Sequence, residues 1–469
     1  MATKPLSDEQ RTQVREMLAR ARAAMKAIEN YDQAQVDRLC QAVAWACGNE
    51  TTMTRIANMA VDETDLGDRV GRVSKRFKII GVLRDALRQK SIGIIEEIPE
   101  KGIVKYAKPA GVIASLIPTT NPEQTPPVTG IYALKAKDAV IFSPHPRARK
   151  TTAEVVRIMR EALRRQGAPE DLFQVIETPS IPLTNELMSI CDLTMATGGQ
   201  PMVRAAYSSG RPAYGVGAGN STMVIDETAD IAEAAMNTRI SKTSDFGSGC
   251  SADGNLIVDE KIYDAFLAQL QKEGGYLCSA EEKAKVEAAM WDAEGHRTIE
   301  TVARAPQVVA KVAGFSIPED RKFLIVQQDM IGREHRFSGE KLTTVLAIYK
   351  YKGFDEALDK VRQIYDVGGK GHSVGIYSFD DDHINRLALM APVSRIMVRQ
   401  PQSKANAGAF NNGMPMTSSL GCGIWGGNIT NENVNLKHFL NVTWVSRPIP
   451  EDRPSDAELF GEFYQSEIF

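Results

Sequence analysis

One cysteine of this 469-residue chain stands in surroundings that suit a nucleophile. Cys250 follows Gly247 and Gly249 in the stretch "SKTSDFGSGCSADGNLIVD" and precedes an apolar run. A free cysteine is more often a small buried hydrophobe, but glycines let a backbone approach a ligand closely. At a junction between an expected helix and an expected strand, the sulfur is reachable and backbone N–H groups can face an oxyanion. The stretch therefore predicts covalent catalysis by this thiol.

Two further polar segments stand where short apolar runs end. "SPHPRARK", residues 143–150, lies between an expected strand and an expected helix, where a cofactor meets the carboxyl end of a parallel sheet. A basic helix start is the alternative. "GVGAGN", residues 215–220, precedes a strand, so it is a weak phosphate-loop pattern and a plain turn is the alternative. No G-x-G-x-x-G follows the first expected strand, so the usual Rossmann fingerprint is missing.

Two blocks of alternating strands and helices are expected to position these groups. The first ninety or so residues read as helical, opening on a capping box of Ser7 and Gln10, and a hairpin follows over residues 91–108. Continuous apolar strands alternating with helices imply parallel sheets covered on both faces. The expected strands are 111–118, 138–144, 172–178, 193–199 and 212–220, then 254–259, 323–329, 342–350, 372–378 and 393–399.

The sequence therefore predicts an α/β fold with two parallel-sheet domains that join near residue 240. No linker rich in proline, glycine or serine separates them. A tail from about Gly427 contains "FLNVTWVSRPI", a strand-like run expected to pair outside its own domain. An exposed apolar strand of this kind favours an oligomer.

Composition narrows the expected partner to a small molecule. The net charge of −3 and the absence of a Lys/Arg-rich run argue against nucleic acid. The polar N-terminus and the lack of an eighteen-residue apolar run argue against a secretory signal or a membrane, so a cytoplasmic location is expected. The cysteines show no metal-binding spacing, which predicts reduced thiols and no bound metal. They are Cys40, Cys47, Cys191, Cys250, Cys278 and Cys422.

Eight motifs taken together resemble, in order and spacing, the aldehyde dehydrogenase superfamily and its CoA-acylating branch. They are "IPTTNP", "FSPHPRA", "ATGG", "GVGAGN", "SKTSDFGSGC", "EKLTTVLAIY", "GGKGHS" and "LGCGIWGGNITNENVNLKHFLN". The resemblance extends over nearly the whole chain. The resemblance implies an aldehyde dehydrogenase-like fold of two Rossmann-type domains plus an oligomerisation arm. Residues 1–240 would bind the nicotinamide, with the hairpin 91–108 as the arm, 241–426 would form the catalytic domain, and 427–469 would return to a subunit interface. The resemblance further implies NAD or NADP as the cofactor and coenzyme A as a co-substrate. It also implies a homo-oligomer, either a dimer or a tetramer.

The resemblance also implies roles for single residues. Cys250 matches the nucleophile, and Glu340 matches the glutamate that holds the nicotinamide ribose. Asn121 is named for the oxyanion, although the ungapped register places Thr120 there. His372 matches a histidine of the acylating branch that acts near the thiol step, with a structural role as the alternative. Cofactor contacts are implied for Thr119, Thr120, Ser143, His145, Pro146, Arg147, Thr197, Gly198, Gly199, Gly217, Gly219 and Glu340.

One departure from the superfamily pattern indicates the acyl acceptor. In hydrolytic members the segment matching "GVGAGN" contains a glutamate that activates water, and here it contains no acid. Deacylation by water should then be slow, whereas the thiolate of CoA is a far better nucleophile toward a thioester. The alternatives are a hydrolytic enzyme with its base elsewhere, a cysteine acyltransferase without nicotinamide chemistry, and a non-enzymatic binding protein.

The substrate is expected to be a short aldehyde. The best overall match is to members of the acylating branch that oxidise sulfoacetaldehyde, and acetaldehyde is the alternative substrate. Binding of a sulfonate group requires charge-assisted hydrogen-bond donors. The candidate donors are Arg204, Arg239, His335 and Arg336. Lys242 is the expected cation for the thiolate. Pro146 stands where NAD-preferring relatives often carry a ribose-binding glutamate, so the sequence leaves NAD against NADP open.

Overall fold

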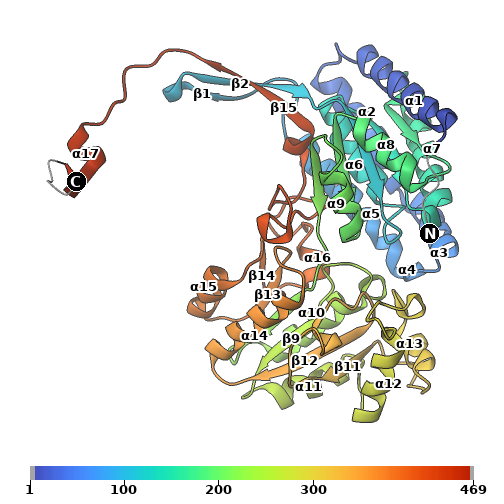
Figure 1. Cartoon of the computed structure of the whole chain (residues 1–469), viewed down its shortest axis with the longest axis vertical. Coiled ribbons are helices and arrows are strands. Elements are labelled where there is room, and N and C mark those ends of the chain that lie inside the picture. The colour runs from blue at the N-terminus through green and yellow to red at the C-terminus, as the bar shows by residue number, and fades with distance from the viewer. Residues whose placement is uncertain (1–5, 465–469) are drawn as a thin grey trace.

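The computed structural model describes residues 6–464, which form two lobes and a projecting arm (Figure 1). The first lobe holds a five-stranded parallel sheet in the order β5-β4-β3-β6-β7. Its strands are β3 (Val112–Ile117), β4 (Ala139–Pro144), β5 (Phe173–Val175), β6 (Leu193–Thr197) and β7 (Ala213–Val216). The helices between them are α6 (Thr125–Ala136), α7 (Arg149–Arg165), α8 (Ile181–Ile190) and α9 (Gln200–Tyr207). The chain runs outward from central β3 in both directions, so a ligand crevice is expected between β3 and β6.

Helices precede this sheet, as the sequence predicts. They are α1 (Asp8–Ala27), α2 (Gln33–Gly48), α3 (Glu50–Thr64), α4 (Arg69–Arg72) and α5 (Arg76–Leu87). The capping box of Ser7 and Gln10 opens α1, which confirms that prediction. Helix α2 packs against α5, α6 and α7, so the helical segment forms part of the first lobe and shares its core.

The second lobe holds a seven-stranded sheet in the order β10-β11-β12-β9-β8-β13-β14, with every pair parallel. Its strands are β8 (Thr222–Ile225), β9 (Asn255–Asp259), β10 (Gly275–Leu277), β11 (Phe323–Gln327), β12 (Val345–Tyr351), β13 (Val374–Tyr377) and β14 (Ile396–Val398). Its helices are α10 (Ile231–Thr243), α11 (Tyr263–Lys272), α12 (Ala280–Met290), α13 (Pro306–Val312), α14 (Phe354–Val367), α15 (Asp381–Met390) and α16 (Gln402–Ala405). The fold is α/β with two parallel sheets, which confirms the predicted fold class.

Strand β8 corrects the predicted junction between the lobes. It pairs with β9 and β13 in the middle of the second sheet, and α10 follows it. The chain therefore leaves the first sheet after Val216 and crosses within residues 217–221, ahead of the predicted junction near residue 240. The sequence indicates a strand after "GVGAGN", but four residues give no signal for the sheet they join, and only the pairing with β9 and β13 assigns β8 to the second lobe.

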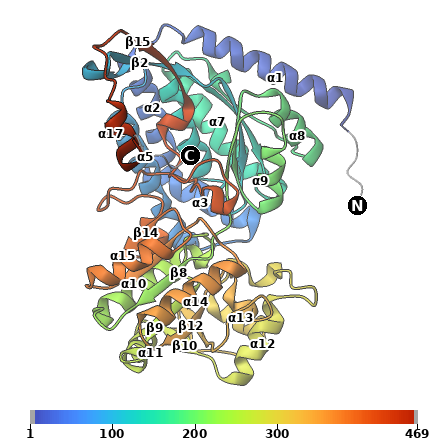
Figure 2. The same cartoon turned by 60° about the vertical axis from the view of Figure 1, so that its left-hand side comes forward.

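A three-stranded antiparallel arm leaves the first lobe. Strands β1 (Gly93–Ile98) and β2 (Ile103–Pro109) form the predicted hairpin, and β15 (Leu440–Ser446) returns from the second lobe to pair with β2. Figure 1 shows the arm projecting from the body and an extended segment that leads on from β15 to α17 (Asp456–Phe460), and Figure 2 shows the same elements turned by 60°. Trp444 on β15 is 59% exposed. Pairing of this arm with a second copy of the chain stays a prediction.

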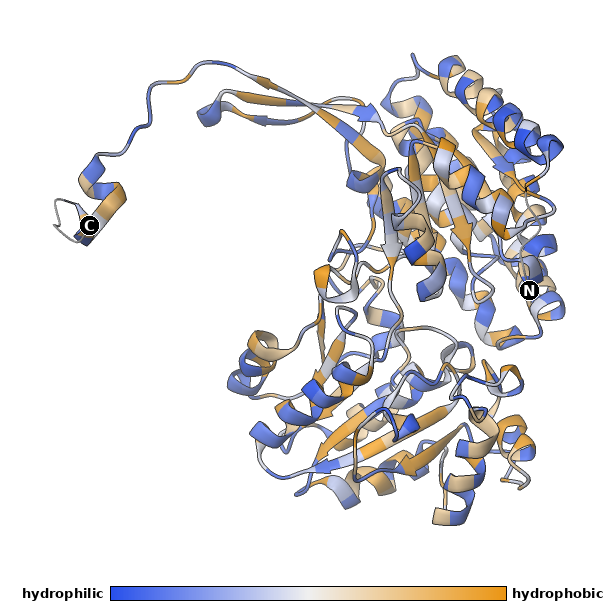
Figure 3. Ribbon diagram, in the orientation of Figure 1, coloured by the Kyte–Doolittle hydropathy of each residue, from blue (hydrophilic) through white to orange (hydrophobic). Residues whose placement is uncertain are grey.

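Separate apolar cores hold the two lobes. The strands of both sheets are coloured largely hydrophobic, and hydrophilic residues are frequent along the helices (Figure 3). All six residues of β3 and of β4 are buried, as expected for central strands covered on both faces. Among the described residues, no helix combines the length and apolar character needed to cross a bilayer.

Candidate active site

The loop that carries Cys250 is held in an unusual backbone conformation. Between α10 and β9, Asp245 (φ 48°) and Phe246 (φ 51°) lie in the left-handed region, which non-glycine residues rarely adopt. The Asp245 carboxylate accepts hydrogen bonds from the Asp68 N–H (2.8 Å) and the Ser248 hydroxyl (2.8 Å), and it contacts the Arg72 guanidinium (3.0 Å). These contacts hold the strained turn and thereby position the cysteine that follows it.

The two glycines before Cys250 have different roles. Gly247 has φ 69°, and a Cβ atom there would lie 2.5 Å from the Thr343 carbonyl oxygen, so this position requires glycine. A Cβ atom at Gly249 would meet nothing within 4 Å. The close approach expected of both glycines is therefore made by Gly247, whereas Gly249 leaves open space beside Cys250.

A cavity of about 620 Å³ opens over Cys250, with walls from both lobes. The first lobe supplies the start of α5, the segment after β3 and the turn after β6. The second supplies the cysteine loop, Glu340 and parts of the segment 403–420. A smaller cavity of about 460 Å³ lies between α1 and the base of the arm, away from this thiol.

Most of the predicted site residues line the larger cavity. They are Thr119, Thr120, Asn121, Thr197, Gly198, Gly199, Gly217, Cys250 and Glu340. Asn121 lies in the turn ahead of α6, where its carbonyl oxygen accepts the Thr125 N–H at 3.0 Å. The Thr120 carbonyl oxygen accepts hydrogen bonds from Arg72 and Lys75, both at 3.1 Å. The segment after β3 is thus anchored to the helices that face the cysteine loop.

The segment "SPHPRARK" lies beside this cavity but does not line it. Ser143, His145, Pro146 and Arg147 follow β4, at the same edge of the sheet as the segment after β3. The Ser143 hydroxyl pairs with Thr184 at 2.8 Å, and Arg147 donates to the Thr64 carbonyl oxygen at 2.7 Å. The Glu63 carboxylate accepts the N–H groups of Lys150 and Thr151, both at 2.7 Å, and so caps α7. The sequence contained no signal for this cap, because Glu63 belongs to α3.

His372 lies directly beside the thiol. Its Nε2 atom is 3.1 Å from Cys250 Sγ, and its Nδ1 atom is 2.9 Å from Ser373 Oγ, to which the Asn406 amide donates at 2.8 Å. Burial lowers the pKa of His372 to about 3, with the Arg395 charge as the second cause. The imidazole is therefore neutral, and its Nε2 atom is free to accept a hydrogen bond from the Cys250 thiol, although so low a pKa makes the ring a weak base. Ser373 and Asn406, which orient this ring, were not predicted.

The cation that acts on the Cys250 thiol is not the predicted Lys242. Burial, followed by the Glu340 charge, raises the pKa of Cys250 to about 12. Arg395 is the cation that favours the thiolate, and it donates to the His372 carbonyl oxygen at 2.8 Å. Lys242 points into the interior near Asp253 and Glu340, and burial lowers its pKa to about 7. Arg395, rather than the predicted Lys242, is therefore the cation whose charge acts on the Cys250 thiol.

The glycine loop "GVGAGN" joins the cysteine to Glu340. The Gly219 N–H donates to Glu340 Oε1 at 3.1 Å, and a Cβ atom at Gly219 would lie 2.0 Å from the Cys250 carbonyl oxygen. Gly217 donates to the Asn428 side chain at 3.1 Å. Gly219 therefore acts through its close approach to the cysteine rather than by lining the cavity. The loop contains no carboxylate.

Two carboxylates occur among the described residues that line the cavity, Asp245 and Glu340. The nearby cations Lys75 and Arg72 outweigh burial and hold the pKa of Asp245 well below its usual range, so it is a poor base. Burial raises the pKa of Glu340 to about 7. Glu340 is therefore the carboxylate of this cavity that can exchange a proton near neutral pH.

The cations proposed for a sulfonate do not line the cavity. Arg239 pairs with Glu273 at 2.6 Å, His335 with Glu334 at 3.6 Å, and Arg336 donates to the Asp292 carbonyl oxygen at 2.8 Å. Arg204 lies on α9, outside the lining. The cations that line it are Lys75, Lys78 and Lys404. Lys75 and Lys78 are three residues apart at the start of a helix, and this spacing was the sequence signal that they share one helix face.

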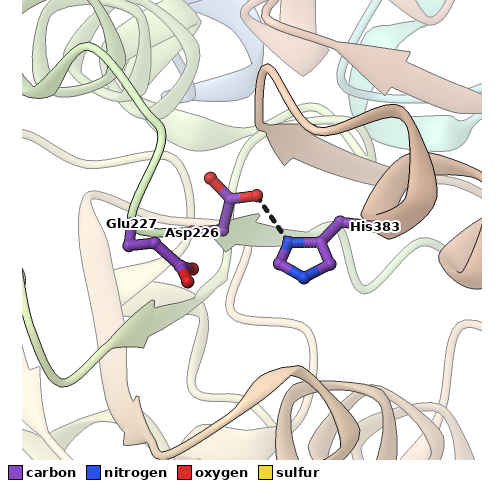
Figure 4. A group of neighbouring side chains, drawn as sticks. All are labelled: Asp226, Glu227 and His383. Atoms are coloured by element: carbon purple, nitrogen blue, oxygen red, sulfur yellow. Dashed lines mark hydrogen bonds and ion pairs between the residues drawn. The ribbon is translucent and has the colours of Figure 1, made fainter.

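A separate cluster joins Asp226, Glu227 and His383, whose possible metal-ligand atoms lie within 4.8 Å of one another. His383 Nδ1 contacts Asp226 Oδ2 at 2.8 Å (Figure 4), and its ring stacks on Phe354. Asp226 also accepts the Thr228 N–H, and Glu227 pairs with Lys261. The cluster follows the carboxyl end of β8, whereas the cysteine loop precedes the amino end of β9. These contacts give each group a structural role, and we propose no metal there.

Alkylation of Cys250 is expected to speed up steadily as the pH rises. Because the pKa of this thiol lies near 12, the thiolate fraction should increase about tenfold per pH unit between about pH 7 and 9. The measurement is the rate of iodoacetamide incorporation at Cys250, read by peptide mass spectrometry. The buried Cys278 serves as the internal control. A plateau below about pH 8 would instead reveal a preformed thiolate–imidazolium pair with His372.

Comparisons with known proteins identify the family of this chain. The model of the aldehyde dehydrogenase family matches residues 3–418. A sulfoacetaldehyde dehydrogenase from Acholeplasma sp is 46% identical over 451 residues, covering 95% of this chain and 93% of that protein. An acylating sulfoacetaldehyde dehydrogenase from Bilophila wadsworthia is 42% identical over 459 residues, with 96% and 98% covered.

A solved structure shows the same architecture. The crystal structure of an acetylating aldehyde dehydrogenase from Geobacillus thermoglucosidasius has a TM-score of 0.91 and 39% sequence identity to this chain. The match covers 95% of this chain and 99% of that one. Sequence and fold agree, and the chain belongs to the aldehyde dehydrogenase family, among its acylating members.

Proposed function

We propose that this enzyme oxidises a short aldehyde to its acyl-CoA with NAD or NADP, through a thioester on Cys250. The observation that carries the proposal is the 3.1 Å contact between His372 Nε2 and Cys250 Sγ, in a cavity with no carboxylate on the glycine loop. The sulfur attacks the aldehyde carbon while His372 relays the thiol proton to the forming alkoxide, because an imidazole with so low a pKa does not keep it. The side-chain amide of Asn121, which lines the same cavity, is the proposed donor to the oxyanion.

The cavity suits a dinucleotide on its first-lobe side. The uncharged turn Thr197–Gly199 lines it directly before the N-terminus of α9, a place that favours phosphate groups. Glu340 is the proposed ligand of the nicotinamide ribose, held in place by the Gly219 N–H. Ser143, His145, Pro146 and Arg147 are proposed to meet the adenosine at the neighbouring strand end. A bound nicotinamide would supply the hydride acceptor.

A thiol is the proposed acyl acceptor because no residue is assigned as the base that would activate water to attack the thioester. Asp245 is tied to Arg72 and Lys75, and the loop 215–220 contains no acid. The thiolate of CoA needs no such base to cleave a thioester. The names of an acylating and of an acetylating relative support this acceptor. One observation favours the hydrolytic alternative, namely that Glu340, with its pKa near 7, lines the cavity.

Sulfoacetaldehyde is the proposed substrate, with acetaldehyde as the next candidate. The support is the sulfoacetaldehyde specificity named for two relatives and the presence of lysines in the cavity wall. We expect kcat/KM for sulfoacetaldehyde to exceed that for acetaldehyde at least tenfold, because a fixed sulfonate contact contributes about 1.5–3 kcal/mol. The test measures both constants by nicotinamide absorbance with saturating CoA, using NAD and NADP in parallel. Equal constants, or a preference for acetaldehyde, would contradict the assignment.

A further inference from the structure

The cavity has a polar end opposite the proposed dinucleotide side. There the start of α5 and the segment 403–417 face Ser244 and Asp245 at the beginning of the cysteine loop. Phe77 and Phe410 also line the cavity, and both are more than half exposed. An aldehyde that presents its carbonyl carbon to Cys250 can direct its other end into this region. The groups at this end therefore decide which tails are accepted.

Four charged groups at this end neutralise one another. Arg72 and Lys75 contact the carboxylates of Asp245 and Glu123, with distances of 3.0 and 2.9 Å to Asp245 and of 3.5 and 3.0 Å to Glu123. Two positive and two negative charges leave this cluster without a net charge. Asp245 therefore neither repels an anion nor offers a free partner to a cation of the substrate.

Lys78 adds a positive charge but has no donor to spare. Its ammonium group donates to the carbonyl oxygens of Ala407 and Gly408, at 2.6 and 2.7 Å, and contacts Met416 Sδ at 3.5 Å. An ammonium group has three N–H donors, and these three contacts use them all. Lys78 therefore positions the segment around residues 407–408 and contributes only its electrostatic field.

Lys404 is different, because most of its capacity to donate is unused. Its Nζ atom donates to Ser244 Oγ at 2.9 Å. The nearby carboxylate of Asp245 is paired with Arg72 and Lys75, and among the described residues Lys404 forms no salt bridge. Two N–H donors remain on a side chain that lines the cavity. The neighbouring Ser403 hydroxyl also has no hydrogen-bond partner among the described residues. An ammonium group with free donors beside other lysines attracts an anion.

We propose that Lys404 is the specificity-determining residue that binds the negatively charged tail of the aldehyde, with Ser244 orienting its ammonium group. This inference rests on the proposed function and deepens it, since it names the contact that selects an anionic substrate. A sulfonate presents three acceptor oxygens, which match the two free N–H donors of Lys404 and the Ser244 hydroxyl. A carboxylate tail would use the same donors. A phosphate of CoA is the other anion that could reach them.

The first test compares Lys404→Met with Lys404→Arg and with the matched control Lys272→Met. Lys272 is exposed on α11 and does not line the cavity. We expect Lys404→Met to lower the kcat/KM ratio of sulfoacetaldehyde to acetaldehyde about tenfold to 100-fold, while Lys404→Arg retains most of it. The control should keep the wild-type ratio. An unchanged ratio in Lys404→Met would overturn the proposal, and so would a loss confined to the KM of CoA.

A second test needs no turnover and separates this inference from the proposed function. Ethanesulfonate, an unreactive anion, should slow iodoacetamide alkylation of Cys250 in the wild type, with sodium chloride as the ionic-strength control. Lys404→Met should lose this protection, whereas Lys272→Met should keep it. Protection that survives in Lys404→Met would refute the contact even if the enzyme acts on sulfoacetaldehyde. Protection lost as expected would support it even if CoA-dependent turnover is absent.

Discussion

Replacing Cys250 with alanine is expected to abolish turnover while leaving dinucleotide affinity close to that of the wild type. The thiol forms the proposed covalent intermediate, so its loss should lower kcat by about 10⁴-fold or more. The residues proposed to hold the dinucleotide, Thr197–Gly199 and Glu340, lie on other elements and do not depend on the sulfur. Steady-state nicotinamide absorbance measures the first effect, and a fluorescence titration with reduced dinucleotide measures the second.

Cys278→Ala is the matched control for this variant. Cys278 is a buried free thiol that follows β10 at the far edge of the second sheet, so the same atoms are removed away from the cavity. Its kcat should stay close to the wild-type value. Comparable steady-state activity in Cys250→Ala would refute the nucleophile assignment, whereas a joint loss of activity and dinucleotide binding would indicate a damaged fold.

Omitting CoA is expected to stall the enzyme after a single turnover. With aldehyde and oxidised cofactor alone, reduced nicotinamide should form in an amount that does not exceed the enzyme, because water has no assigned base with which to cleave the Cys250 thioester. Adding CoA should then restore continuous turnover. Stopped-flow absorbance gives the burst, and intact-protein mass spectrometry should show the acylated enzyme during the stall.

Glu340→Gln separates the two ways in which this expectation can fail. Sustained release of a carboxylic acid without CoA would show that water is activated after all. If Glu340→Gln then removed the CoA-independent release but kept the burst, Glu340 would be the base and the hydrolytic alternative would hold. A burst and stall in the wild type would rule that alternative out.

The chemistry of the site was visible in the sequence mainly where backbone constraints are local. Gly247 marks a left-handed turn before Cys250, and such a turn needs glycine whatever surrounds it. The alternation of apolar strands with helices likewise follows from neighbouring residues, and both sheets are parallel as predicted. Local signals predicted a strand after "GVGAGN" but not the sheet to which it belongs, which only the pairing of β8 with β9 and β13 determines. The predicted junction between the lobes therefore lay too late in the chain.

Charge partners were the part of the site that the sequence could not assign. Arg204, Arg239, His335, Arg336 and Lys242 were candidates because they lie close in the sequence to recognisable motifs. Proximity along the chain does not determine which way a side chain points or which carboxylate it meets. The cations that line the cavity, Lys75, Lys78 and Lys404, come from segments more than three hundred residues apart.

By itself, the sequence determined the type of fold and the family resemblance and led to the proposed nucleophile, because local periodicity, glycine-dependent turns and the order of motifs are properties of the linear chain. The tertiary structure decided which groups act on Cys250. His372 reaches the sulfur from the segment before β13, Arg395 supplies the favourable charge, and Lys404 meets Ser244 across the cavity. Each of these relations joins distant segments, and its strength depends on distance and burial, which are defined only once the two lobes have packed together.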